Sequence, residues 1–476
     1  MGTYDLAERS RGLANRGRDV IVTLDPRETE KKGGFMEHRR WFKALALVAV
    51  LTVVAGACAS DNGGDNTGDN GGVDCATVEF GCVEVGPDEA INLGAAQVIS
   101  GADSTLGQDQ VNGIELALDY LDGTFDQKDG TLLDHPVKLT TEDELCSAEG
   151  GQTAGTALAA DASIVAVIGT SCSSAALGVA DKLLGDKGIL LISGSNTSPA
   201  LTDPALHNPF YARTAHNDRI QGAIVAEFSL GADVGPKAKT AATIADESPY
   251  TQGLVGAFEA NFEAGGGTLT GSEQVDSEDT DFKPVLRSLA EQKPDVLYFP
   301  IFVAACTLVI KQAAEIMPDT TLIVSDGCLS SDTLKNAGKA ADGVWASSPD
   351  LSAFQKNEFY SGEFIPAYQA AFGSDPLSVF HAHAYDAANV VFEAIKKVAI
   401  DNGDGSLSIP RQALRDAVFA TSGYAGVTGT ITCLPTGDCA TDVTIGLFLG
   451  PGWPVEGGKG DTTAKYTDTK SLDDVL

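Results

Sequence analysis

Long hydrophobic runs and basic residues are both scarce in this sequence. Its longest apolar stretch, residues 44–57, has 14 residues, fewer than the roughly 20 that a membrane-spanning helix needs. The chain has 32 lysines and arginines against 66 aspartates and glutamates, a formal charge of −34. Residues 1–57 contain 10 of the basic and 7 of the acidic residues, so the remainder carries 22 against 59, or −37. So acidic a body is a poor partner for nucleic acid and anionic lipid surfaces, and it fits plain solubility and adaptation to salt equally well.

Recognised catalytic and metal-binding signatures are absent as well. The sequence has neither the G-x-x-x-x-G-K-[ST] phosphate loop nor the G-x-S-x-G nucleophile motif. A nucleophilic serine within residues 171–174 would need a histidine beside it, and neither His207 nor His216 stands in a motif. His381 and His383 would point to different faces of a helix, and the C-x2-4-C pairs of zinc sites are missing. We therefore expect no enzyme activity, no metal and no cofactor.

The N-terminal part has the pattern of an exported bacterial lipoprotein. A basic patch at residues 37–43 follows Met36, the apolar run comes next, and the sequence VAGAC then resembles a lipobox, in which the cysteine is lipidated. We assign residues 1–57 to upstream sequence and a signal peptide, with Met36 as the true start and Cys58 as the lipidated mature N-terminus. Residues 58–74, dominated by Gly, Asn and Asp, are expected to form a flexible tether. An uncleaved membrane-anchoring helix is the alternative.

The nine cysteines support export. Without Cys58, eight remain, the even number that disulfides require. Many pairings are possible, and sequence proximity favours Cys75 with Cys82, Cys146 with Cys172, Cys306 with Cys328, and Cys433 with Cys439.

Two short apolar strands, each followed by a hydroxyl-rich loop, stand close together in the chain. Residues 164–168 lead into GTSCSS and residues 189–192 lead into SGSNTS, with a helix expected between them over 175–184. Adjacent parallel strands of this kind place both loops at the same edge of a sheet, where ligands bind in open α/β sheets.

The loops also carry helix-start signals. Ser173 and Ser174 open a helix, whose free N-H groups favour an anion such as a carboxylate. Ser198 before Pro199 indicates a second helix start. Simple helix capping by these hydroxyls is the alternative, but two such loops side by side favour a small-molecule site.

The rest of the chain alternates strand-like and helix-like segments, which predicts doubly wound α/β domains. The expected strands are 90–99, 137–141, 241–245, 268–275, 296–300, 321–325 and 343–347. The expected helices are 110–121, 153–160, 252–264, 282–292, 305–316 and 384–398. Residues 426–449, with a turn at 435–437, are expected to form an antiparallel hairpin.

Together these features resemble a known family. The lipobox, the tether, Ser100-Gly101 after the first strand, and the segments GTSCSSAA, ISGSNTSP, DESPYTQG and VSDG, in this order, resemble the Leu/Ile/Val-binding type of periplasmic binding protein, the solute receptor of an ABC importer. The resemblance implies two Rossmann-like lobes joined by a three-crossing hinge and closing on a ligand. The expected lobes are 90–215 with 343–398, and 216–342 with 399–450, followed by a C-terminal tail at 451–476.

The resemblance also implies a ligand site. The hydroxyl of Ser173, the backbone of Asn196 and Thr197 would hold a ligand carboxylate, and Asp326 would receive its α-ammonium group. Tyr250 matches an aromatic residue contributed by the second lobe. The remaining matches are Phe302, where the family often has tyrosine, Leu106, at a position that can be aromatic, and the disulfide of Cys146 with Cys172.

The implied function is therefore a non-enzymatic receptor, lipid-anchored on the outer face of the bacterial cell membrane. It would hand a small polar ligand, an amino acid of branched-chain type, to an ABC permease and its ATPase. A sensory lipoprotein, a receptor for amides, urea or aromatic acids, and an exported hydrolase are the alternatives.

Overall fold

The computed structural model describes residues 74–475. The expected signal peptide, Cys58 and residues 58–73 of the expected tether lie outside the described residues. Between residues 74 and 475, no helix is both long and apolar enough to cross a membrane.

The first sheet has six strands in the order β3-β4-β2-β5-β6-β7, and all of its pairs are parallel except β3 with β4. Its central strand β5 is buried along its whole length, as expected for a continuous apolar run in a sheet covered on both faces. The strands are β2 (Ile91–Gln97), β3 (Thr131–Leu132), β4 (His135–Asp143), β5 (Ile164–Gly169), β6 (Leu190–Ser193) and β7 (Tyr211–Arg213).

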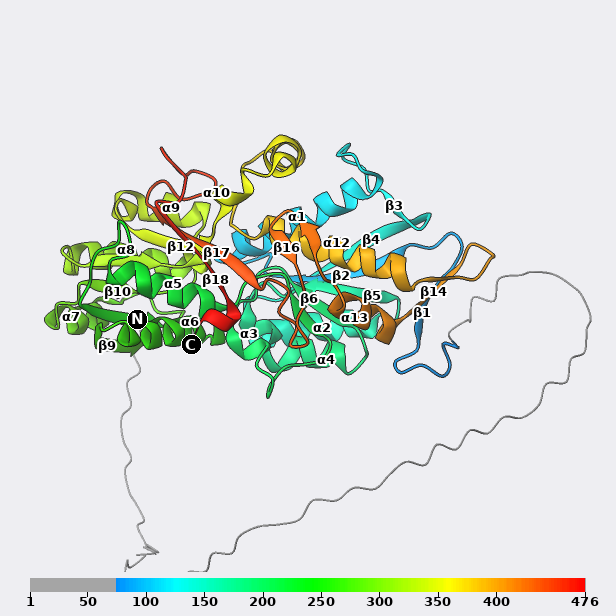
Figure 1. The fold of residues 1–476 in the computed structure, drawn as a ribbon, viewed down its shortest axis with the longest axis horizontal. Coiled ribbons are helices and arrows are strands. Elements are labelled where there is room, and N and C mark those ends of the chain that lie inside the picture. The colour runs from blue at the N-terminus through cyan, green and yellow to red at the C-terminus, as the bar shows by residue number, and fades with distance from the viewer. Residues whose placement is uncertain (1–73, 476) are drawn as a thin grey trace, which may run out of the picture. The chain divides into compact units, whose positions relative to one another are not determined.

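Helices cover both faces of this sheet (Figure 1). One face carries α1 (Ser104–Asp119), continued by η1 (Tyr120–Asp122), and α12 (His381–Val398). The other carries α2 (Ala148–Ala160) and a helix made of α3 (Ser173–Ala175), the wider turn η2 (Ala176–Ala180) and α4 (Asp181–Gly185).

The second sheet has seven strands in the order β18-β17-β12-β11-β10-β8-β9, parallel from β9 to β12 and antiparallel beyond β12. The strands are β8 (Thr240–Ala245), β9 (Thr268–Gln274), β10 (Val296–Tyr298), β11 (Thr321–Val324), β12 (Trp345–Pro349), β17 (Asp442–Leu449) and β18 (Tyr466–Ser471). One face packs against α5 (Asp218–Leu230) and α6 (Pro249–Ala264); the other side is formed by α7 (Lys283–Glu291), α8 (Val303–Ile316), α9 (Ser331–Ala337), η4 (Asp326–Cys328) and η5 (Gly338–Ala341).

Smaller elements complete the described chain. They are β1 (Cys82–Val85), β13 (Ile400–Asp401) and β14 (Leu407–Pro410), which form a three-stranded sheet, the hairpin of β15 (Tyr424–Gly426) and β16 (Gly429–Ile431), the helices α10 (Leu351–Phe354), α11 (Ile365–Phe372) and α13 (Arg411–Phe419), and the short turns η3 (Pro199–Leu201), η6 (Tyr360–Phe364) and η7 (Leu472–Asp474).

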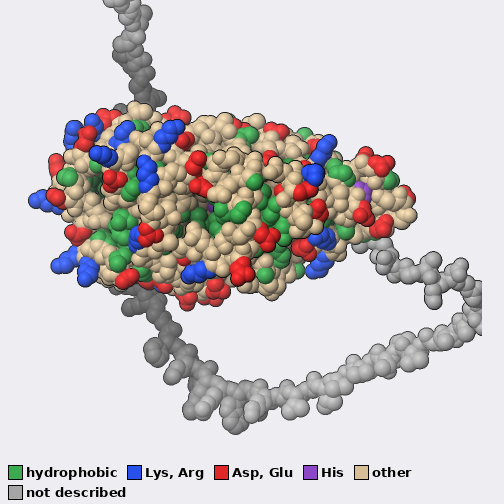
Figure 2. Space-filling view, turned by 90° about the horizontal axis from the view of Figure 1, so that it is seen from above, with side chains coloured by type: hydrophobic (Ala, Val, Ile, Leu, Met, Phe, Trp, Pro, Cys, Tyr) green, Lys and Arg blue, Asp and Glu red, His purple; other side chains and the backbone are tan. Residues whose placement is uncertain are grey.

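The chain passes between the two large sheets three times: between β7 and α5, after β12, and between β16 and β17. Two α/β sheets joined in this way are the architecture that the sequence predicts. On the face shown in Figure 2, acidic side chains are scattered widely and basic ones are fewer, in keeping with the charge balance.

Several expected boundaries differ. Residues 426–449 do not form one hairpin, because β15 pairs with β16 whereas β17 pairs with β12 and β18. The expected tail at 451–476 contributes β18, the edge strand of the second sheet. Ser198 opens only the short turn η3 and has no side-chain cap bond there.

The lobe assignment also needs correction at two places. Strand β12, placed with the first lobe in segment 343–398, is parallel to β11 in the second sheet. Of segment 399–450, placed with the second lobe, α13 packs against α12 and β6 beside the first sheet. The physical reason is that an apolar strand or helix can join either sheet, and pairing distant in sequence decides which.

The described residues contain four disulfides, and they are the pairs that sequence proximity favours: Cys75 with Cys82, Cys146 with Cys172, Cys306 with Cys328, and Cys433 with Cys439.

Candidate functional site

The loops after β5 and β6 are bonded into one unit. The carbonyl oxygen of Thr170 accepts hydrogen bonds from Ser193 Oγ at 2.7 Å and from Asn196 Nδ2 at 2.8 Å. Ser173, the first residue of α3, accepts from the backbone N-H of Ser198 at 3.3 Å through its Oγ. Both loops are buried, so the hydroxyls of this edge are held in place before any ligand arrives.

A buried arginine supports the second loop from behind. Arg213 donates through Nη1 to the carbonyl oxygens of Asn196 at 3.1 Å and Ser198 at 2.8 Å, and it pairs with Asp438 at 2.7 Å. Its charge is therefore neutralised within the protein.

The backbone N-H of Asn196, which the sequence predicts to bind a ligand carboxylate, donates to Ser193 Oγ at 2.9 Å in this structure.

Thr197 and Asp218 lie together where the first crossing meets α5. The backbone N-H of Asp218 donates to the carbonyl oxygen of Thr197 at 3.0 Å. Both side chains are fully buried, and their oxygens make no hydrogen bond of ordinary geometry. Burial, and then the negative charge of Asp326, raise the pKa of Asp218 well above its usual range, although the nearby Thr197 hydroxyl acts in the opposite direction. Buried polar groups without a partner in the protein need a specific explanation, and contact with a ligand would be one.

Asp326 follows β11 and is held by an amide. Its Oδ1 accepts from Gln221 Nε2 at 2.7 Å, and the same nitrogen donates to Ser347 Oγ at 2.9 Å. Burial raises the pKa of Asp326 to about 6, while the hydrogen bond from Gln221 opposes that rise. The amide oxygen of Gln221 accepts from His216 Nε2. Burial also lowers the pKa of His216 to about 4, so its imidazole is neutral and brings no positive charge to Asp326.

A cavity of about 330 Å³ lies at the three crossings, next to His216. Its lining includes His216 from the first crossing, Asp350 from the second and Asp442 from the third.

Tyr250 and Phe302 form an aromatic pair beside Asp326. Ser248 caps α6 by accepting from the N-H of Tyr250 at 3.1 Å, which fixes the start of the helix. The Tyr250 hydroxyl lies 2.5 Å from Ser325 Oγ and accepts from Gly327 N-H at 3.2 Å. The rings of Tyr250 and Phe302 have centroids 5.1 Å apart. A Cβ at Gly327 would lie 3.0 Å from Tyr250 Cε1, so glycine permits this close approach.

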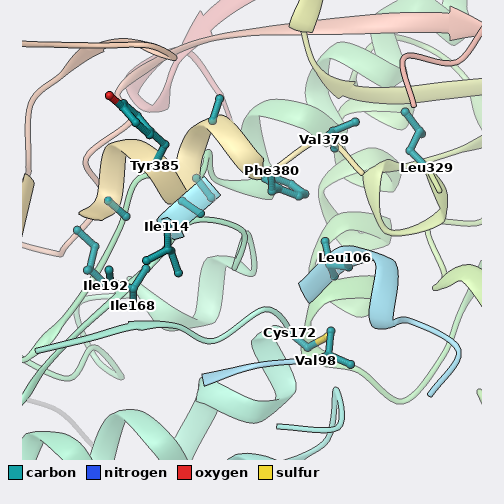
Figure 3. Close-up of a cluster of buried hydrophobic side chains, with 14 of the residues drawn as sticks. Val98, Leu106, Ile114, Ile168, Cys172, Ile192, Leu329, Val379, Phe380 and Tyr385 are labelled. Carbon is teal, nitrogen blue, oxygen red and sulfur yellow. The ribbon is translucent and has the colours of Figure 1, made fainter. Parts of the chain in front are cut away.

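Leu106 belongs to a buried apolar cluster. Figure 3 shows it on α1, near Val98 and Cys172 on one side and toward Leu329 on the other. Leu106 is buried, so it provides an apolar wall and no hydrogen bond.

Hydrogen bonds join elements of the two sheets around these residues. Ser198 Oγ donates to the carbonyl oxygen of Pro249 at 3.0 Å, and Thr105 Oγ1 lies 2.8 Å from Ser330 Oγ. The structure thus brings the loops of Ser173 and Thr197 against those of Tyr250 and Asp326. Chemically, it gathers the hydroxyl groups of Ser173 and Thr197 with the carboxyl groups of Asp218 and Asp326, and the Thr197 hydroxyl lies beside Asp218.

Sequence reasoning missed Asp218 and Gln221. Asp218 follows Asn217, which caps α5, so in the sequence it resembles an ordinary acidic residue of a first helical turn. Gln221 stands one turn later and has no motif. Only their position in the chain could have indicated a role: both residues lie in the first turns of α5, the helix that follows β7, and the end of β7 lies at the site.

Sequence comparisons find relatives that are about one quarter identical to this chain. A Leu/Ile/Val-binding protein of Rhizobium johnstonii is 26% identical over 308 residues, covering 64% of this chain and 79% of that protein. A Leu/Ile/Val-binding protein homolog of Brucella melitensis is 26% identical over 352 residues, covering 74% and 89%.

Solved structures share the fold. A leucine-binding protein of Thermotoga maritima superposes with a TM-score of 0.67 at 20% identity, covering 81% of this chain and all of that one. A solute-binding protein of R. palustris in complex with benzoate gives 0.65 at 22% identity, covering 78% and 96%. The family model described as periplasmic binding protein matches residues 90–445. By this match over most of its length, the chain belongs to the periplasmic binding protein family.

Proposed function

We propose that this protein is an extracytoplasmic solute receptor that binds an α-amino acid between its two lobes and delivers it to an ABC importer. The observation that carries the proposal is the pair Asp218 and Asp326, which are buried together and form no ion pair in the described part of the chain. The charge of Arg213 reaches Asp218 and lowers its pKa, but the guanidinium is itself paired with Asp438. A buried carboxylate without a partner is costly. A ligand ammonium group would supply the missing charge, and the hydroxyls of Ser173 and Thr197 would bind the ligand carboxylate.

The relatives named for leucine, isoleucine and valine support an amino acid with an aliphatic side chain. Leu106 and the ring of Phe302 would contact that chain. The two lobes would close over the ligand by motion at the three crossings, and hydrogen bonds between them, such as those of Ser198 and Thr105, would hold the closed form.

The partners follow from the same proposal. The proposed receptor has no catalytic role, and a membrane permease and an ATPase would provide the transport step. Lipidation at Cys58 would keep the receptor at the outer face of the membrane, with the acidic body on a tether.

A thermal-melting screen of the purified full-length protein tests the proposal. L-amino acids should raise the melting temperature, because a ligand that binds only the native state stabilises it by mass action. Urea, benzoate and the amine-free analogue 4-methylpentanoate should not. The response should be lost in Asp326→Asn and kept in Asp319→Asn, an exposed carboxylate elsewhere. A shift produced only by ligands without an amino group would overturn the amino-acid assignment.

A further inference from the structure

Three more acidic side chains lie at the edges of the same site. Asp103 precedes α1, Glu144 follows β4 and Asp246 follows β8. Each has one buried carboxyl oxygen without a hydrogen-bond partner: Oδ1 of Asp103, Oε2 of Glu144 and Oδ2 of Asp246. Glu144 is 0% exposed and Asp246 1% exposed. None of the three has a lysine, arginine or histidine within ion-pair distance in the described part of the chain.

Glu144 and Asp246 are each attached to a segment that carries an expected ligand residue. Glu144 Oε1 accepts from the N-H of Cys172 at 3.2 Å, directly before Ser173. Asp246 Oδ1 accepts from the N-H of Ser248 at 2.8 Å, two residues before Tyr250. The second oxygen of each carboxyl group therefore lies beside the site without a hydrogen-bond partner.

Asp103 lies between these two groups. It stands one turn before Leu106, and the N-H groups of Val303 and Ala304, which directly follow Phe302 at the start of α8, lie close enough to lower its pKa. Burial raises the pKa of Asp103 to about 6, and the negative charge of Asp246 adds to the rise. Burial likewise raises the pKa of Glu144 strongly, with further contributions from the negative charges of Asp143 and Asp103. The charge of Asp246 thus acts on Asp103 and the charge of Asp103 acts on Glu144, and none of the three carboxyl groups has a counter-charge.

A bound metal ion does not account for this arrangement. Among residues 74–475, the one group of His, Cys, Asp or Glu side chains with metal-ligand spacing is Cys75, Cys82 and Glu84, whose two sulfurs are in a disulfide. The three carboxyl groups are therefore too far apart to share a small ion. An ammonium or guanidinium group has several N-H donors that point in different directions, so it can serve carboxylates at wider spacing.

We propose that Asp103, Glu144 and Asp246 bind a second cationic group of the ligand, so that the receptor takes an amino acid whose aliphatic chain ends in an ammonium or guanidinium group. The inference rests on the proposed function, because it assumes that the α-ammonium and α-carboxylate lie at Asp326 and Ser173. Leu106 and Phe302 contact the aliphatic part of the side chain, and the three acids receive its end. The two cationic groups of the ligand then provide positive charge at Asp326 and at the three acids, where the protein itself forms no ion pair.

Isothermal titration of the full-length protein with matched ligands tests this inference. L-lysine and L-norleucine have the same straight carbon chain, but only lysine carries the terminal ammonium. We expect lysine or arginine to bind about tenfold or more tightly than norleucine and leucine. Asp103→Leu should reverse that order by removing the central acid, and Glu144→Gln should reduce the preference in the same direction. Asp319→Asn, an exposed acid outside the site, should leave it unchanged.

The outcomes separate the two proposals. If norleucine or leucine binds the wild-type protein as tightly as lysine and arginine, the second cationic group is wrong while the amino-acid receptor stands. If putrescine binds and no α-amino acid does, the three acids bind a cation but the proposed function is wrong. Binding of neither amino acids nor putrescine would overturn both.

Discussion

Gln221 Nε2 lies 2.7 Å from Asp326 Oδ1, while its amide oxygen accepts from His216. The bond to His216 orients the Gln221 amide. Because the imidazole engages the amide oxygen, only the NH₂ group can face the carboxylate of Asp326. Gln221 is thus a neutral donor that favours the ionised form of Asp326 without competing with a ligand for its charge.

Replacing Gln221 by leucine should therefore weaken amino-acid binding by about tenfold, because Asp326 loses a donor and its ionised form becomes harder to maintain. The pH at which affinity falls should also move upward, which a purely structural role would not produce. Titration calorimetry at several pH values measures both effects. The matched control is Gln412→Leu, whose amide donates to Asp416 at 2.9 Å on the protein surface; equal losses in the two variants would refute the role of Gln221.

Thr197→Val tests the carboxylate end. Its hydroxyl is buried and makes no hydrogen bond of ordinary geometry, so removing it should cost the unliganded protein at most about 1 kcal/mol while weakening ligand binding about tenfold. Thr333 on α9 is also buried with an unbonded hydroxyl, which makes Thr333→Val the control. Comparison of melting temperatures with ligand affinities separates the two effects, and unchanged affinity in Thr197→Val would exclude that hydroxyl from the site.

The affinity for an α-amino acid should depend on pH through Asp326. Burial raises its pKa to about 6 in the unliganded protein, and a ligand ammonium favours the ionised form. Binding below that pH must therefore expel a proton, so affinity should rise between about pH 5 and pH 7 and then level off. The unliganded protein follows the opposite trend: this group contributes stability below its unfolded pKa, near 4, and that contribution is lost as pH rises through about 6. Calorimetry in buffers of different ionisation enthalpy counts the protons, and Asp326→Asn should remove this share of the dependence.

Arg213→Met should destabilise the protein by about 3–5 kcal/mol, because it leaves Asp438 buried without its counter-charge. The Arg213 side chain is fully buried. Lys182→Met, which removes a salt bridge between two exposed side chains, should cost less than about 1 kcal/mol. Urea unfolding measures both, and similar values would show that the Arg213 pair contributes no more than a surface pair.

Two helical glycines should respond to alanine in opposite directions. A Cβ at Gly151 in α2 would lie 2.2 Å from the carbonyl oxygen of Ala175, whereas a Cβ at Gly256 in α6 would meet no atom within 4 Å. Gly151→Ala should therefore destabilise by about 1–3 kcal/mol and disturb the Ser173 loop. Gly256→Ala should stabilise by about 0.5–1 kcal/mol. A neutral Gly151→Ala would mean that α2 can move away from α3 at little cost.

Much of the fold could be predicted because its parallel strands are buried on both faces and appear as continuous apolar runs. Strand β5, expected at residues 164–168, extends from Ile164 to Gly169. Elements with weaker burial are harder to predict. Strand β18 alternates partly buried and exposed residues at a sheet edge, so its sequence pattern resembles that of an irregular tail. The partners of β16 and β17 were also wrong, because a turn signal marks a reversal of the chain and not which strands pair.

The site was only partly predictable for a different reason. Ser173, Thr197, Tyr250 and Asp326 stand in loops after strands or at the first residues of the helices that follow them, so sheet topology brings them together. Gln221 acts on Asp326 across 105 positions of sequence, and no local pattern reports such a contact.

The two disulfides next to the site also matter for recombinant production. Cys146 with Cys172 fixes the segment before Ser173, and Cys306 with Cys328 ties the turn that begins at Asp326 to α8. Protein made in a reducing cytosol would retain the apolar cores of both sheets and yet lack the cross-links beside each half of the site. A sample of that kind would melt cooperatively and have an ordinary helix content, and its failure to bind a ligand would reflect the oxidation state of four sulfur atoms rather than the specificity of the receptor.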